Sequence, residues 1–322
     1  MLVLSFTFSP QRSDKTLDTA MREDTYTPIF FHPQWVSEKY YGWTCIRQDL
    51  GLRVIRKRVG FVEKTLFMAN GLGDEELADA IIKDGSSKRF GIDIIHKFSS
   101  TQTMPSVEIA GQLFALLTRD RQLNIGTFIM DLALSQDHLW KNYGPKSRNM
   151  VRKAREIGAQ LRVSTGPTPD LDTFFSFYKP IVKRLGLQLP SRALISKMLR
   201  SGDLLCLTAL DSTSVPLITN LVYLCEPYAY FLYGASAQKA AGGFGQFLQW
   251  ETTRLLKERG YRWYDLGGVA TTNPSDGIYS FKRSLGGQYI DLGSEYRRVS
   301  RPVSQLYEWQ RKLRSFRHLW RF

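Results

Sequence analysis

Hydrophobic residues in the second half of the chain recur with two periods, one typical of helices and one typical of strands. Residues 170–185 and 191–201 carry apolar side chains every three or four positions, which predicts two helices. Continuous apolar runs bounded by turn residues predict buried strands instead. These runs cover residues 127–132, 160–164, 203–210, 216–224, 228–236 and 263–268.

Two consecutive helices are predicted between the first two of these strands. Ser135 is placed to begin one helix and Gly144-Pro145 to end it, and Ser147 is placed to begin another that runs to Gly158. One side of the second helix is apolar, and the opposite side carries arginines at i, i+4 and i+7. These arginines are Arg148, Arg152 and Arg155.

The two ends of the chain give weaker patterns. Residues 1–130 alternate short apolar runs with polar stretches and include one helical pattern near residues 107–120, which indicates mixed strands and helices. A terminal helix is predicted from about Ser304, with an apolar stripe that packs on the body of the protein or lies on an anionic membrane surface. The stripe consists of Leu306, Trp309, Leu313, Phe316 and Trp320.

Composition excludes several classes of protein. The chain has 322 residues, 43% apolar and 23% charged, which fits two domains of modest size. Its longest apolar stretch, residues 215–237, is broken by prolines and by Glu226 before it reaches the ~20 residues that a bilayer span needs. Three distant cysteines and four histidines without ligand spacing predict neither disulfides nor a metal site. We therefore expect a soluble protein of the reducing cytoplasm, without a secretion signal.

The net charge of +14 is concentrated in two segments. Residues 141–162 hold seven basic residues and one acidic residue, and residues 297–322 hold eight and one. Clustered lysine and arginine favour a phosphate-bearing partner such as nucleic acid, and a solvated basic surface is the alternative.

A glycine-rich segment, residues 238–245, follows the strand at 228–236 and enters a helix predicted over residues 246–259. Free backbone N–H groups at a helix N-terminus form an anion site. The glycines are equally consistent with close packing of the helix against the sheet.

Four stretches of the second half resemble the FemABX family of GNAT-like transferases, which add amino acids from aminoacyl-tRNA to peptidoglycan peptides. Residues 1–120 are similar only through residues 34–35 and 41–43, so the acceptor-binding residues of the family cannot be placed in this half of the chain. The four stretches are TFIMDL (127–132) with KSRNMVRKA (146–154), YGAS (233–236), QWE (249–251) with YDLGG (264–268), and GIYSFKRSLGG (277–287).

The resemblance implies an α/β protein of two GNAT-like lobes, each a mixed sheet flanked by helices. Residues 1–145 are expected to form the first lobe, completed by a C-terminal helix at 301–322. Residues 146–300 are expected to form the second lobe, with the family motifs. The coiled-coil arm of some members is absent, because no long heptad pattern fits between Asp203 and Gly260.

The resemblance also implies the site. Lys282 matches a family lysine placed over the reacting ester or its phosphate, where a cation stabilises the transition state; the alternative is an exposed lysine at a strand end. Asp265 and Asp276 are candidate carboxylates for binding or deprotonating the amine, and Asp265 is also consistent with a loop cap. Tyr279 completes the candidate catalytic set. The candidate donor- or phosphate-binding residues are Lys146, Arg148, Arg152, Arg155, Gly242, Gly243, Gly245 and Phe281.

The implied activity is transfer from aminoacyl-tRNA, as co-substrate, to an amine of a peptide such as a peptidoglycan precursor. No further cofactor is expected, and the protein is expected to be a monomer with possible peripheral contact at the inner membrane surface. Acyl-coenzyme A is the alternative donor, although Ala240 stands where its binding loop has Gln or Arg. A natural-product acceptor and a non-enzymatic RNA- or membrane-binding protein remain alternatives.

Overall fold

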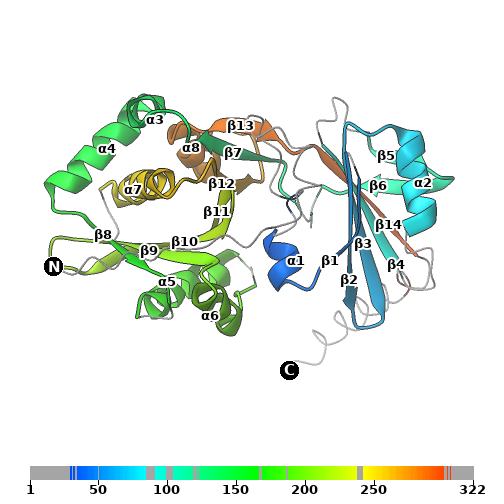
Figure 1. The fold of residues 1–322 in the computed structure, drawn as a ribbon, viewed down its shortest axis with the longest axis horizontal. Coiled ribbons are helices and arrows are strands. Elements are labelled where there is room, and N and C mark those ends of the chain that lie inside the picture. The colour runs from blue at the N-terminus through cyan, green and yellow to red at the C-terminus, as the bar shows by residue number, and fades with distance from the viewer. Residues whose placement is uncertain are drawn as a thin grey trace, which may run out of the picture.

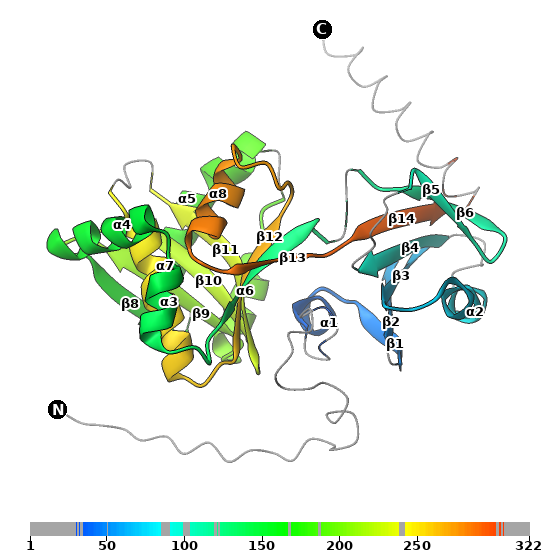
Figure 2. The same ribbon diagram turned by 90° about the horizontal axis from the view of Figure 1, so that it is seen from above.

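The computed structural model describes most of the chain between residues 30 and 305. The described residues are 30, 32, 35–49, 51–84, 91–98, 104–118, 121, 123–166, 169–185, 188–237, 242–300, 303 and 305. Two seven-stranded mixed sheets form two lobes that lie side by side (Figures 1 and 2). The expected α/β architecture of two lobes, each a mixed sheet flanked by helices, is confirmed.

The first sheet has the strand order β1-β2-β3-β4-β14-β6-β5. Helix α2 (Asp74–Asp84) covers its outer face with Leu77, Ala80 and Ile81, and α1 (Val36–Tyr40) lies on the side of the second lobe (Figure 1). The strands are β1 (Thr44–Asp49), β2 (Leu52–Val59), β3 (Val62–Asn70), β4 (Gly91–Phe98), β5 (Ser106–Ile109), β6 (Gln112–Leu116) and β14 (Ser294–Val299).

The second sheet has the strand order β13-β7-β12-β11-β10-β9-β8. Helices α3 (Gln136–Asn142), α4 (Pro145–Glu156) and α7 (Phe244–Glu258) cover one face, and α5 (Pro169–Leu185) and α6 (Arg192–Arg200) cover the other (Figure 1). Helix α8 (Gly277–Ser284) packs beside β12. The strands are β7 (Gly126–Asp131), β8 (Gln160–Ser164), β9 (Leu204–Leu210), β10 (Pro216–Cys225), β11 (Tyr228–Ser236), β12 (Trp263–Val269) and β13 (Gln288–Asp291).

Several expectations need correction. The helical pattern near residues 107–120 is wrong, because β5 and β6 form a hairpin there and turn at Ala110 and Gly111, which both have positive φ. Helix α4 begins at Pro145 rather than after Ser147, since proline fits the first helical turn where no N–H bond is lost. Helix α7 begins two residues earlier than expected, at Phe244.

The boundary between the lobes also differs from the expected one at residue 145. Strand β7 and helix α3 belong to the second sheet, so the chain changes lobe between β6 and β7. It returns through β14, which lies between β4 and β6 in the interior of the first sheet. The helix expected at 301–322 lies almost entirely outside the described residues.

The lobes share one continuous apolar core. Leu66 and Ile94 of the first sheet belong to the same cluster as Phe174 of α5, Ile195 of α6 and Tyr223 of β10. Lys39 of α1 adds a polar contact at the side of this core, with its Nζ 2.7 Å from Asp203 Oδ2. The two sheets are therefore held against each other by buried apolar surface.

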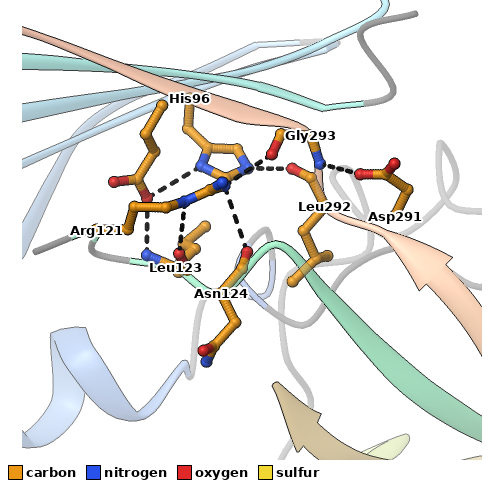
Figure 3. A network of polar contacts seen from close by, with 8 residues as sticks. His96, Arg121, Leu123, Asn124, Asp291, Leu292 and Gly293 are labelled. Carbon is orange, nitrogen blue, oxygen red and sulfur yellow. Dashed lines mark hydrogen bonds and ion pairs between the residues drawn. The ribbon is translucent and has the colours of Figure 1, made fainter. Parts of the chain in front are cut away.

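A buried polar network joins the two chain segments that connect the sheets (Figure 3). Glu295 Oε1 accepts a hydrogen bond from the Leu123 N–H at 2.7 Å and lies 3.1 Å from His96 Nδ1. Arg121 donates to the carbonyl oxygens of Leu123 at 3.1 Å and of Gly293 at 2.7 Å. Glu295 and His96 are fully buried, so a polar atom of this network that lost its partner would remain unsatisfied and would destabilise the protein.

We expect Glu295→Ala to lower the free energy of unfolding by about 3 kcal/mol, because the buried Leu123 N–H and the His96 ring lose their common acceptor. Glu108→Ala, at an exposed position of β5 in the same lobe, is the matched control and should change it by less than about 0.5 kcal/mol. Urea unfolding of both variants measures the difference, and equal stability of the two variants would contradict the role of the network.

Candidate functional site

The candidate site begins where two parallel strands of the second sheet separate. Strands β11 and β12 pair through only three positions, from Tyr228–Trp263 to Tyr230–Asp265, although both continue beyond them. Strand β12 bends at this point, because its register against β7 shifts between Asp265 and Gly268. The part of β11 beyond Tyr230 has no ladder partner on this side among the described strands, which leaves backbone groups for an extended ligand.

Asp265 holds the bend of β12. Its Oδ1 accepts hydrogen bonds from Thr127 Oγ1 at 2.5 Å and from the Gly267 N–H at 2.8 Å, and the side chain is fully buried. Gly267 has φ +79°, and a Cβ there would lie 2.8 Å from the Phe231 carbonyl oxygen, so only glycine fits the bend. These contacts match the loop-cap interpretation of Asp265.

Lys282 points its ammonium into the same bend. It lies on α8, not at the end of a strand, and its Nζ donates to the carbonyl oxygens of Gly267 at 2.8 Å and Gly268 at 2.9 Å. The residue is 8% exposed, so the alternative of an exposed lysine at a strand end is wrong. Burial lowers the pKa of Lys282 to about 8, and the negative charge of Asp265 acts in the opposite direction.

Tyr230 approaches the bend from β11. Its hydroxyl forms a hydrogen bond with the backbone of Gly268, and burial raises its pKa above the ordinary value. The sequence alone does not single out this tyrosine, because β11 is rich in aromatic residues and nothing local distinguishes one of them. Its pairing with Asp265 across the two strands becomes visible only in the register.

The remaining candidates of the catalytic set support α8. Asp276 is the N-cap of the helix, and its Oδ1 accepts from the Tyr279 N–H at 2.8 Å. The Tyr279 ring packs against Phe128 with centroids 5.4 Å apart.

Phe281, a candidate for donor binding, lies beside the start of α7, since a Cβ on Gly245 would be 3.6 Å from its ring.

The glycine-rich segment serves packing at one position and leaves space at the others. Gly243, the N-cap of α7, has φ +95°, and a Cβ there would lie 2.4 Å from the Met150 carbonyl oxygen of α4. Gly242 has open space around its Cα, and Gly245 meets only ordinary side-chain contacts. Residues 238–241 lie outside the described residues. Close packing therefore explains Gly243, while Gly242 and Gly245 have no such requirement for glycine.

Two of the three arginines on α4 are used within the protein. Arg148 donates to the carbonyl oxygens of Lys141 at 2.8 Å and Tyr143 at 2.6 Å, at the C-terminal end of α3. Arg155 pairs with Glu251 of α7 at 2.6 Å. Two members of the predicted arginine stripe therefore join α4 to the neighbouring helices α3 and α7 and are not free for a phosphate-bearing partner.

Arg152 and Lys146 remain exposed on α4. The Arg152 guanidinium lies 5.6 Å from the centroid of the Trp140 ring, which leaves its outer edge in solvent. Lys146 lies in the first turn of α4, which touches the end of α8, since the Gly144 N–H donates to the Ser284 carbonyl oxygen at 2.9 Å. The first turns of α4 and α7 therefore each contact α8, the helix that carries Lys282.

Within the part of the chain that the structure describes, no group of His, Cys, Asp and Glu side chains could hold a metal ion. None of the described helices is long and apolar enough to cross a membrane.

Comparison with solved structures supports the fold. The chain is similar to the crystal structure of FemX, with a TM-score of 0.59 and 16% identity over 85% of this chain and 95% of that one. It is also similar to L-PGS from Bacillus licheniformis, with a TM-score of 0.51 and 13% identity over 87% of this chain and 95% of that one. No protein-family model matches the sequence, and no curated protein matches it. The chain therefore has the two-lobed, FemX-like fold that these structures share.

The buried ammonium gives stability a distinctive pH dependence. Between about pH 8 and pH 10.5 the unfolded chain keeps the Lys282 proton that the folded chain has lost, so the free energy of unfolding rises with pH. From pH 8 to pH 9.5, we expect the free energy of unfolding of the wild type to rise by about 1.5 kcal/mol more than that of Lys282→Met, which lacks the titrating group. Urea unfolding at both pH values measures this difference, and a constant difference would contradict a buried lysine with a lowered pKa.

Proposed function

We propose that the protein is an acyltransferase that moves an amino acid from aminoacyl-tRNA to an amine of a peptide acceptor, such as a peptidoglycan precursor. The observation that carries this proposal is the Lys282 ammonium, which two carbonyl oxygens hold where β11 and β12 separate. The resemblance of residues 277–287 to the FemABX motif and the FemX-like fold support the same class of reaction.

The reaction needs no protein nucleophile. The acceptor amine attacks the ester carbonyl carbon of the donor, so that a C–N bond forms and the bond from this carbon to the ribose oxygen breaks. Negative charge develops first on the carbonyl oxygen and then on the leaving oxygen, and the proton lost by the amine ends on the latter. A fixed donor of hydrogen bonds next to these oxygens stabilises the transition state more than the ground state.

Lys282 suits this task for two reasons. An ammonium has three N–H donors, and the two carbonyl contacts leave one for the ester. Its lowered pKa of about 8 lies near neutral pH, so the group can also give a proton to the leaving oxygen and regain it. Asp265 and Tyr230 act as positioning residues, because both bind the backbone of the bend that orients Lys282.

Acyl-coenzyme A is the second candidate donor. The N-terminus of α7, whose first turn contacts Phe281 of α8, is a place for the phosphates of such a donor. The exposed cations of α4 favour a larger anion, because Lys146 and Arg152 extend the basic surface beyond this helix terminus.

Lys282→Met tests the catalytic part of the proposal. The substitution keeps most of the bulk and removes the donor, so we expect turnover with saturating charged tRNA to fall about 100- to 1,000-fold. Lys282→Arg should recover only part of the rate, because a planar guanidinium does not fit the same point.

Arg283→Gln is the matched control, since Arg283 is the next residue of α8 and is exposed. Circular dichroism at the assay temperature verifies that all variants are folded. Wild-type turnover in Lys282→Met, or an equal loss in the control, would show that the motif is structural.

A second experiment tests the donor surface. In this experiment, Lys146 and Arg152 are both replaced by glutamine, and the Kd for tRNA is measured over a range of salt concentrations. The slope of log Kd against log salt concentration should fall by about 0.7–0.9 for each phosphate that the variant no longer neutralises. Lys183 and Arg184, exposed on α5 at the opposite face of the sheet, supply the control pair. An unchanged slope in the first variant would contradict binding of tRNA along α4.

A further inference from the structure

A buried amide of the second lobe has no hydrogen-bond partner. Asn220 of β10 is 3% exposed, and its side chain forms no hydrogen bond with another described residue. Every other buried polar side chain that the structure describes in this lobe is bonded, as Gln249 is to the Tyr264 hydroxyl at 2.8 Å. A buried amide without a partner lowers stability, and such groups are typical of functional sites.

Asn220 lies beside the strand separation that forms the candidate site. Register places it opposite Gly234 of β11, beyond the point where β11 leaves β12. A Cβ on Gly234 would lie 3.1 Å from Asn220 Oδ1 and 2.7 Å from the Phe231 ring. Because Gly234 has no Cβ, the amide and the aromatic ring can lie next to each other above this strand.

The Phe231 ring connects the amide with the lysine of the site. Lys282 Nζ lies 5.9 Å from the centroid of this ring. The backbone of Phe231 also borders the bend of β12, since a Cβ on Gly267 would lie 2.8 Å from the Phe231 carbonyl oxygen and 3.2 Å from Lys282 Nζ. Asn220 and Lys282 are therefore both neighbours of one aromatic side chain, so a short substrate group at Lys282 is close to the amide.

Apolar side chains occupy this face of β10 and β11. Ile218 and Phe231 belong to the cluster that packs against Phe244 and Phe247 of α7. Neither Oδ1 nor Nδ2 of Asn220 is sealed from solvent, so a ligand can still reach the amide. A single hydrogen-bonding group in apolar surroundings discriminates sharply, because a ligand without the matching group leaves it unsatisfied.

We propose that Asn220 binds the α-amino group of the aminoacyl donor and thereby selects aminoacyl groups over plain acyl groups. This inference rests on the proposed function, which puts the ester carbonyl of the donor at Lys282. The α-amino group lies only two bonds from the carbonyl carbon. Asn220 Oδ1 accepts a hydrogen bond from it, and the face of the Phe231 ring attracts it when it is protonated. An acetyl group offers the amide no such donor.

Calorimetry with two adenosine compounds tests the inference without any transfer reaction. Each carries its acyl group in amide linkage on a 3′-amino group; one has a glycyl group and the other an acetyl group, so they differ only in the α-amino group. We expect the wild type to bind the glycyl compound about tenfold more tightly and Asn220→Leu to bind both equally. Asn70→Leu, the same change at an exposed position of β3, is the control and should keep the wild-type preference.

Stability separates a binding role from a structural one. Asn220→Leu and Asn220→Val break no hydrogen bond of the ligand-free protein, so at least one of them should melt at or above the wild-type temperature. Gln249→Leu, which removes the partner of the buried Tyr264 hydroxyl, should melt a few degrees lower. Melting of both Asn220 variants below the wild type would make Asn220 a structural residue and overturn the inference.

The outcomes for this inference and for the proposed function are distinct. A preference for the glycyl compound that Asn220→Leu loses supports the inference, even if no transfer from charged tRNA is observed. Equal binding of the two compounds by the wild type, or binding of neither, overturns it. Transfer from charged tRNA with unchanged KM and kcat in Asn220→Leu also overturns it, and would leave the proposed function intact.

Discussion

The buried carboxylate of Glu295 is the group on which the arrangement of the two lobes depends. Strand β14 follows β13 after only Leu292 and Gly293, so the chain passes directly from the edge of one sheet to the interior of the other. Glu295 then binds Leu123, which lies on the other connection between the sheets. Both connections are thus tied to one residue, while the shared apolar core holds the face of the first sheet with Leu66 and Ile94 against the second lobe.

The second lobe supplies the catalytic group of the proposed reaction. Asp265 and Gly267 bend β12, and the bend provides the carbonyl oxygens that hold Lys282. Burying a lysine against carbonyl oxygens costs stability, and such a cost is typical of sites that bind or react.

The sequence could predict the second lobe better than the first. The strands expected at 203–210, 216–224 and 228–236 are confirmed, because each is a long apolar run that ends at turn residues. The hairpin of β5 and β6 escaped prediction because its apolar residues imitate a helical period, while the turn at Gly111 decides the structure. The burial of Lys282 on α8 depends on a bend in strand β12, so it has no local signal in the sequence.

The donor is the central claim, and one measurement tests it directly. Purified protein is incubated with a peptide amine acceptor and either tRNA charged with a radiolabelled amino acid or radiolabelled acetyl-coenzyme A, each with and without ribonuclease. The account predicts that label moves from the charged tRNA alone and that ribonuclease abolishes the transfer. Transfer from acetyl-coenzyme A that ribonuclease does not affect, with none from charged tRNA, would contradict it.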